Sequence, residues 1–146
     1  MSQQRGQARY LKARIEQLNS RLARFMRLTE MPFSLKLDPD ERVFTFTTQD
    51  GYVHPAVHLS GAQKSMSAVA LQMALLAVMR PGMNLYLVDE PAEALDGANK
   101  LVLAGMFHRL NKMFANMDGT MLVVTRDEQI VESCENNIEI TGGEAK

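Results

Sequence analysis

The first 30 residues carry a helical pattern of apolar positions. These positions recur in steps of four and three, which is the spacing of a coiled-coil seam. The pattern predicts a helix from Gln4 to Thr29 that ends before Pro32. An amphipathic helix lying on a core would show a short seam of the same kind, so both interpretations stay open. The seam positions are Leu11, Ile15, Leu18, Leu22 and Phe25.

Alternating apolar and polar residues follow this helix. The runs 33–37 and 43–47 alternate with the period of a strand, and the polar segment 38–41 between them has the composition of a turn. The pattern predicts a β-hairpin. His54 and His58 come next, in an expected loop. Two histidines without clustered cysteines or carboxylates are a weak metal site, so we expect ordinary loop histidines.

A long apolar helix and an apolar strand come next. Residues 60–79 form an apolar run of helix length, and residues 85–88 form one of strand length that leads into Asp89 and Glu90. Such a run is typical of a parallel strand buried on both faces. The two carboxylates would then lie at the strand's carboxyl end, where open α/β sheets bind ligands. One could hold a hydrated Mg²⁺ while the other orients water, although the same pattern arises where a strand simply ends in solvent.

The last third of the chain predicts one more helix and two strands. Residues 97–117 show the period of an amphipathic helix, residues 121–125 form an apolar strand, and residues 137–140 form an edge strand. Together the elements indicate an α/β protein with a parallel sheet and covering helices. The helix residues expected to face the sheet are Leu101, Val102, Phe107, Leu110, Met113 and Phe114.

Length and charge favour a single domain. The chain has 146 residues and a formal net charge of -1, so its overall charge demands no polyanionic partner. Gln72 interrupts the apolar helix and the polar N-terminus has no signal-peptide core, which favours a cytoplasmic protein without a membrane partner. The single cysteine, Cys134, cannot form an intramolecular disulfide, which suits a reducing compartment.

Basic residues concentrate in the first helix. Seven Arg and Lys side chains accompany only two acidic ones, Glu16 and Glu30. A basic face there could contact a phosphate backbone, but a run of charge is also the ordinary state of a solvated helix face. The basic residues are Arg5, Arg9, Lys12, Arg14, Arg21, Arg24 and Arg27.

The start of the long helix and the end of the apolar strand form a pair of motifs. Residues 58–65 read His-Leu-Ser-Gly-Ala-Gln-Lys-Ser, and the helix, a Pro-Gly break, the strand and Asp-Glu-Pro follow in that order. This arrangement resembles the signature and Walker B motifs of ABC-type ATPases. Ala94-Leu95-Asp96 is similar to the family's D-loop, and residues 123–127 stand where the family has its switch histidine. Over nearly its whole length the chain resembles the C-terminal lobe of SMC proteins and of the SMC-like subunit of double-strand-break repair nucleases.

The resemblance implies roles for individual residues. Asp89 would contact Mg²⁺, usually through water, and Glu90 would be the general base or orient the water that attacks the γ-phosphate of ATP. Two positions depart from the family pattern, because Ala62 replaces a glycine and Arg126 replaces the switch histidine. The signature residues would act in trans across a head-to-head dimer. The implied nucleotide-binding residues are Ser60, Gly61, Gln63, Lys64, Asp96 and Arg126.

The family's P-loop is absent from these residues, since no Gly-x-x-x-x-Gly-Lys-Ser/Thr sequence occurs. In SMC-like ATPases the P-loop lies in an N-terminal lobe, separated from the C-terminal lobe by a long coiled coil. The resemblance therefore implies half of a head, with residues 1–30 as a coiled-coil stub and residues 31–146 as the C-terminal lobe. A fragment, a truncated product and one half of a split ATPase all remain open.

The implied function is ATP hydrolysis with Mg²⁺, in DNA repair, recombination or chromosome organisation, once the lobe joins a P-loop lobe and dimerises. Further expected partners are a nuclease subunit and, through the complex, DNA. The alternative is a non-catalytic module that docks on an intact head and modulates it. The acid pair Asp89 and Glu90 favours hydrolysis, whereas Ala62 and Arg126 favour the alternative.

Overall fold

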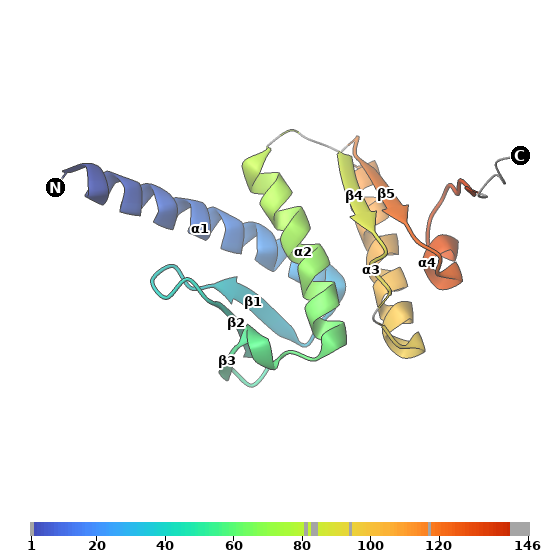
Figure 1. Ribbon diagram of the computed structural model, residues 1–146, viewed down its shortest axis with the longest axis horizontal. Coiled ribbons are helices and arrows are strands. Elements are labelled where there is room, and N and C mark those ends of the chain that lie inside the picture. The colour runs from blue at the N-terminus through green and yellow to red at the C-terminus, as the bar shows by residue number, and fades with distance from the viewer. Residues whose placement is uncertain (1, 81, 83–84, 94, 117, 141–146) are drawn as a thin grey trace, which may run out of the picture.

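The computed structural model describes residues 2–80, 82, 85–93, 95–116 and 118–140. It arranges helices beside a small antiparallel sheet and a parallel strand pair (Figure 1). In chain order the elements are α1 (Ser2–Thr29), β1 (Phe33–Leu37), β2 (Phe44–Thr48), β3 (Val53–Pro55), the 3₁₀ helix η1 (Ala56–His58), α2 (Gly61–Met79), β4 (Leu85–Asp89), α3 (Gly97–Ala115), β5 (Thr120–Val124) and α4 (Glu128–Glu132).

The predicted seam of α1 is buried along its C-terminal part. Ile15, Leu18, Leu22 and Phe25 lie in the core, whereas Leu11 is exposed. In Figure 1 the N-terminal turns of α1 extend away from the rest of the molecule. The helix therefore lies on the core through about its last four turns, from Ile15 onward, and its first seam position is uncovered.

The predicted hairpin is confirmed, and a third strand extends it. β1 pairs antiparallel with β2, and β2 pairs antiparallel with β3. His54, expected in a loop, lies in β3 with its ring centroid 5.3 Å from that of Phe46. β3 has only three residues and ends at Pro55, which lacks the N–H group that a longer strand would use. A strand of three residues is too short to show an alternation of apolar and polar residues in the sequence.

The side chain of Asn19 joins α1 to this sheet. Its Oδ1 accepts a hydrogen bond of 2.8 Å from the backbone N–H of Leu37, and its Nδ2 donates one of 2.9 Å to the carbonyl of the same residue. The amide thus pairs with β1 as a neighbouring strand would. This contact fixes where the sheet lies along the helix.

β4 and β5 form the predicted parallel pair, but one face of it is open. Tyr86 and Val88 are buried, and the Tyr86 ring packs on Phe114 of α3 with centroids 4.4 Å apart. On the other face Leu85 is 49% exposed and Leu87 is 56% exposed. The expectation of a strand covered on both faces is therefore wrong for this chain, because helix packing covers only one side of the pair.

Two predictions for the last third are also wrong. The buried stripe of α3 is Leu103, Met106, Phe107, Leu110 and Phe114, with partly buried Met113 beside it. On the helical wheel Leu101 and Val102 lie outside this stripe, and both side chains are exposed. Residues 137–140 form no strand, since Ile138 and Ile140 are almost fully exposed and no neighbouring strand pairs with them in the described chain. The expected helix end at Met117 lies outside the described residues.

α2 is the central helix of the fold. By length and composition it could cross a membrane, with a mean hydropathy of 1.2, despite the interruption at Gln72. One side of α2 is buried and packs against α1, through residues that include Met66, Ala70 and Met73. The opposite side carries exposed Leu75 and Met79. A core helix passes the same test of composition, and about 33% of this stretch is buried inside the molecule.

Candidate functional site

The carboxyl end of β4 holds the predicted acid pair. Asp89 is the last residue of the strand and its side chain is exposed. Glu90 follows with a φ of 42°, and its backbone N–H donates a hydrogen bond of 2.8 Å to the carbonyl of Val124. A positive φ is unusual for a side chain larger than glycine and has an energetic cost that clusters at functional sites. The chain thus turns sharply at Glu90 while it stays attached to β5.

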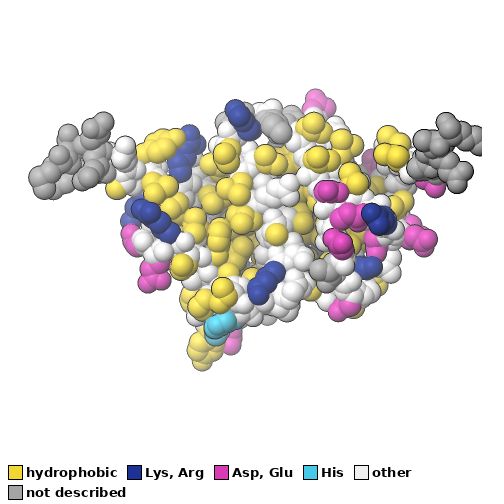
Figure 2. All heavy atoms as spheres, viewed as in Figure 1, with side chains coloured by type: hydrophobic (Ala, Val, Ile, Leu, Met, Phe, Trp, Pro, Cys, Tyr) yellow, Lys and Arg dark blue, Asp and Glu magenta, His cyan; other side chains and the backbone are white. Residues whose placement is uncertain are grey.

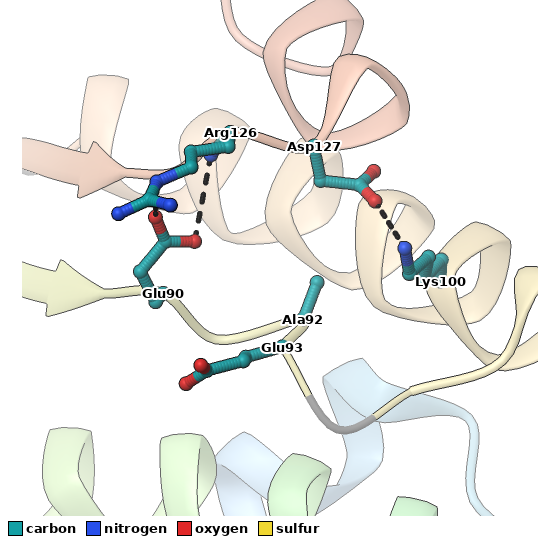
Figure 3. Close-up of a pocket in the computed structure, with 6 residues that line it drawn as sticks. All are labelled: Glu90, Ala92, Glu93, Lys100, Arg126 and Asp127. Atoms are coloured by element: carbon teal, nitrogen blue, oxygen red, sulfur yellow. Dashed lines mark hydrogen bonds and ion pairs between the residues drawn. The ribbon is translucent and has the colours of Figure 1, made fainter.

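Arg126, just beyond the end of β5, contacts both carboxylate oxygens of Glu90. Its Nε lies 3.4 Å from Oε1, and its backbone N–H donates to Oε2 over 3.4 Å (Figure 3). The Arg126 side chain is otherwise 96% exposed. The structure therefore brings together two predicted site residues that stand 36 positions apart, although Arg126 was expected on nucleotide.

A second ion pair lies beside the first. Lys100 Nζ of α3 is 2.6 Å from Oδ2 of Asp127. The other carboxylate oxygen of Asp127 accepts backbone hydrogen bonds from Gln129 and Ile130 at the start of α4. The Lys100 ammonium, followed by these N–H donors, holds the pKa of Asp127 below its ordinary 3.8, although burial acts in the opposite direction. Asp127 therefore connects α3, α4 and the end of β5.

These two ion pairs border an open hollow of about 250 Å³. Figure 3 shows its side chains, which come from the turn after β4, from α3 and from the segment after β5. The described residues that line it are Glu90, Ala92, Glu93, Lys100, Arg126 and Asp127. The sequence patterns gave no role to Glu93, Lys100 or Asp127. Asp127 could have been recognised as a helix N-cap, but a pairing between Lys100 and Asp127 leaves no sequence signal.

The predicted signature residues form the N-terminus of α2. Ser60 Oγ accepts a hydrogen bond from the Gln63 backbone, and Gln63 Oε1 accepts one from the Ser60 backbone, which is a complete capping box. A Cβ added at Gly61 would meet nothing within 4 Å, so its backbone is open to an approaching group. Lys64 is exposed. The side-chain oxygen of Gln63 already accepts the capping hydrogen bond, so its side-chain amide nitrogen is the group that could contact nucleotide.

The signature and the acid pair share one side of the molecule. α2 runs antiparallel to β4, so the N-terminus of the helix and the carboxyl end of the strand point the same way (Figure 1). Asp96, the predicted D-loop acid, caps α3, where its Oδ1 accepts bonds of 2.9 Å from both the backbone and the side chain of Asn99. The structure leaves Ser60, Gln63 and Asp96 engaged in helix caps, and of the predicted site residues it joins Glu90 with Arg126.

Mg²⁺ is compatible with this donor set. The described residues contain no cluster of three or more His, Cys, Asp and Glu side chains suited to a metal. Mg²⁺ bound with nucleotide, however, needs only one or two carboxylates, because phosphates and water supply its other ligands. The exposed carboxylate of Asp89 at the strand end can serve as one such ligand.

The sequence of this chain is similar to that of a curated DNA-repair ATPase. No protein-family model matches the sequence. The chain is 27% identical, over 93 residues, to the DNA double-strand break repair Rad50 ATPase of Saccharolobus solfataricus, a match that covers 64% of this chain and 10% of the relative. It thus spans about a tenth of that protein.

Solved SMC heads share the fold. The SMC head domain from Thermotoga maritima matches with a TM-score of 0.63 and 22% identity, covering 89% of this chain and 45% of that one. A chain from work on ATP-driven dimerization and DNA-stimulated activation of SMC ATPases matches with a TM-score of 0.73 and 17% identity, covering 94% and 84%. The fold is that of the C-terminal lobe of an SMC-like ABC ATPase head. In sequence the chain resembles a Rad50 ATPase.

Proposed function

We propose that this chain is the C-terminal half of an SMC-like ATPase, which completes ATP hydrolysis together with a P-loop lobe. The observation that carries the proposal is the open apolar face of the β4–β5 pair directly beside the acid pair. Leu87 lies opposite Leu122, and Asp89 lies opposite Val124. We call the exposed set Leu85, Leu87, Leu122 and Val124 the outer sheet face.

The outer sheet face has the character of an interface rather than of an ordinary surface. Its four side chains are each about half exposed, and covering them would contribute on the order of 1 kcal/mol apiece. Figure 2 shows that hydrophobic side chains also gather over α2 on the same side of the molecule. A second lobe packed there would sit next to Asp89 and Glu90. A P-loop carried by that lobe could hold the phosphates within reach of both carboxylates.

The chemistry assigned to this chain follows from the acid pair. Bound Mg²⁺ would neutralise charge on the phosphates, and Asp89 would hold it through water or directly. Glu90 would accept a proton from, or orient, the attacking water. The open backbone at Gly61, with Ser60 and Lys64 beside it, would receive the γ-phosphate held by an opposing head, because a helix N-terminus attracts anions. Asp96 would reach the same interface.

The N-terminal helix fits the same function. We propose that residues 1–30 form the root of a coiled coil, since Leu11 continues the buried seam but is exposed. The likeness to a Rad50 ATPase supports a role in DNA repair or chromosome organisation, in the cytoplasm, with DNA and a nuclease subunit as partners of the complex. The basic side chains of α1 would then lie where a DNA backbone could reach them.

The proposal is tested by separating the two carboxylates in a head assembled from this chain and a P-loop lobe. Glu90→Gln should keep ATP-driven association and lose hydrolysis, because the amide preserves shape but not basicity. Asp89→Asn should weaken the association itself, because it removes charge from the Mg²⁺ shell. Asp50→Asn, in an exposed turn of the small sheet, is the matched control. Identical phenotypes for the two substitutions would refute the division of roles.

A further inference from the structure

Arg126 is the one side chain of the described hollow that contacts the proposed base. It approaches Glu90 from two directions, with the guanidinium on Oε1 and the backbone N–H on Oε2. Both contacts measure 3.4 Å, longer than the roughly 2.7–3.2 Å of a well-formed N–H···O bond. Contacts of catalytic groups are often long before substrate binds and tighten afterwards. Arg126 is therefore placed where it can orient the Glu90 carboxylate.

The backbone on both sides of this contact is anchored. Glu90 is tied to β5 by its N–H bond to Val124. On the other side, the backbone N–H of Asp127 donates to Thr125 Oγ1 over 3.1 Å, and the Asp127 carboxylate is held by Lys100 and by the start of α4. Arg126 lies between these fixed points. Its backbone N–H is consequently held in place beside Oε2 of Glu90, and the exposed guanidinium adds a second contact at Oε1.

We infer that Arg126 is a positioning residue that orients the Glu90 carboxylate for the attacking water, acting through Glu90 and not through nucleotide. This inference rests on the proposed function, since it gives Glu90 the part of the base. Arginine suits the task because its forked donor set stays protonated at every physiological pH. The expected cost of losing it is misplacement of the base, which can lower a rate on the order of tenfold to a hundredfold.

The contact itself is tested in the chain alone, by NMR of the Arg126 Nε–H group. Glu90→Gln should shift this resonance, because it removes the charge that the guanidinium faces. Glu93→Gln is the matched control: this carboxylate lines the same hollow, but it forms no ion pair in the described part of the chain. A resonance that ignores Glu90→Gln, or that responds equally to Glu93→Gln, would overturn the inference.

The catalytic consequence is tested in the head assembled with a P-loop lobe and supplied with Mg²⁺ and ATP. Arg126→Ala should lower kcat about tenfold or more and leave KM for ATP within about twofold, and Arg126→Lys should recover part of the loss. Combined with Glu90→Gln, Arg126→Ala should cost nothing further, because both act through one carboxylate. A raised KM with unchanged kcat would instead assign Arg126 to nucleotide.

The outcomes distinguish a failure of the positioning role of Arg126 from a failure of the proposed ATPase function. If Glu90→Gln slows hydrolysis by about 10²–10⁴-fold but Arg126→Ala lowers the residual rate further by its own full factor, Arg126 acts independently and only the positioning role fails. If Glu90→Gln leaves hydrolysis intact, Glu90 is not the base, and both the proposed mechanism and the positioning role are wrong.

Discussion

The side-chain amide of Gln72 donates a hydrogen bond of 2.9 Å to the backbone carbonyl of Leu87. Gln72 is the only polar residue between Ser67 and Arg80, in the middle of α2, and Leu87 is in the middle of β4. The contact is exposed to solvent, so it has the modest net value of an ordinary intramolecular hydrogen bond. The contact links the helix that begins with the predicted signature to the strand that ends with the acid pair.

We expect Gln72→Met to destabilise the fold by about 0.5–1.5 kcal/mol, the net value of one hydrogen bond at a partly exposed site. Methionine keeps the length and helix propensity of glutamine but has no donor. Urea unfolding followed by circular dichroism measures the difference. Gln49→Met, in an exposed turn, should change the stability by less than about 0.5 kcal/mol. Equal stability of Gln72→Met and the wild type would show that the Leu87 carbonyl needs no partner.

The outer sheet face should make the isolated chain self-associate. Apolar side chains that await a partner associate with one another when the partner is missing. We expect the double substitution Leu87→Lys and Leu122→Glu to increase the monomer fraction measured by light scattering after gel filtration. Leu101→Lys changes an exposed leucine on α3, outside this face, and should have no such effect. A wild-type chain that stays monomeric at high concentration would contradict the proposal that the outer sheet face is an interface.

Asp127 should make stability depend on pH in the acidic range. Its folded-state pKa lies below 3.8, mainly because of Lys100, so the unfolded chain binds the proton more readily. The stabilisation is complete above the unfolded value and is lost as the pH falls through the folded one. We therefore expect Asp127→Asn to lower Tm at pH 7, with a difference from wild type that shrinks below pH 3.8. A difference that is constant from pH 7 to pH 2.5 would exclude this linkage.

Periodic patterns predicted the three long helices, the hairpin, β4 and β5, because each of these elements buries one regular face. The short helices η1 and α4 were not predicted, since neither is long enough to show a helical period. Ile15, Leu18 and Leu22 keep their spacing in the core, and β4 ends at Asp89 as expected. β3 escaped prediction because three residues are too few for alternation to show. Residues 137–140 resemble a strand in sequence, but no partner strand is present for them in the described fold.

The candidate site was predicted only in part, for a related reason. Asp89 and Glu90 follow an apolar strand, so their location could be read from the pattern. The ion pair between Glu90 and Arg126 depends on the parallel register that sets Asp89 opposite Val124, and register between distant strands has no local signature. An apolar surface left open for a missing lobe was expected, but the pattern could not tell which face of β4 it would be, because an apolar run looks the same whether a partner lobe or the same chain covers it.

ATP hydrolysis by the chain alone, compared with the chain assembled with a P-loop lobe, tests the proposed function most directly. We expect no turnover from the isolated chain, because its 146 residues supply no cradle for the β-phosphate. The assembled head should hydrolyse ATP, and Glu90→Gln should slow it by about 10²–10⁴-fold. Robust turnover by the isolated chain, or a Glu90→Gln head as fast as wild type, would contradict the half-head ATPase.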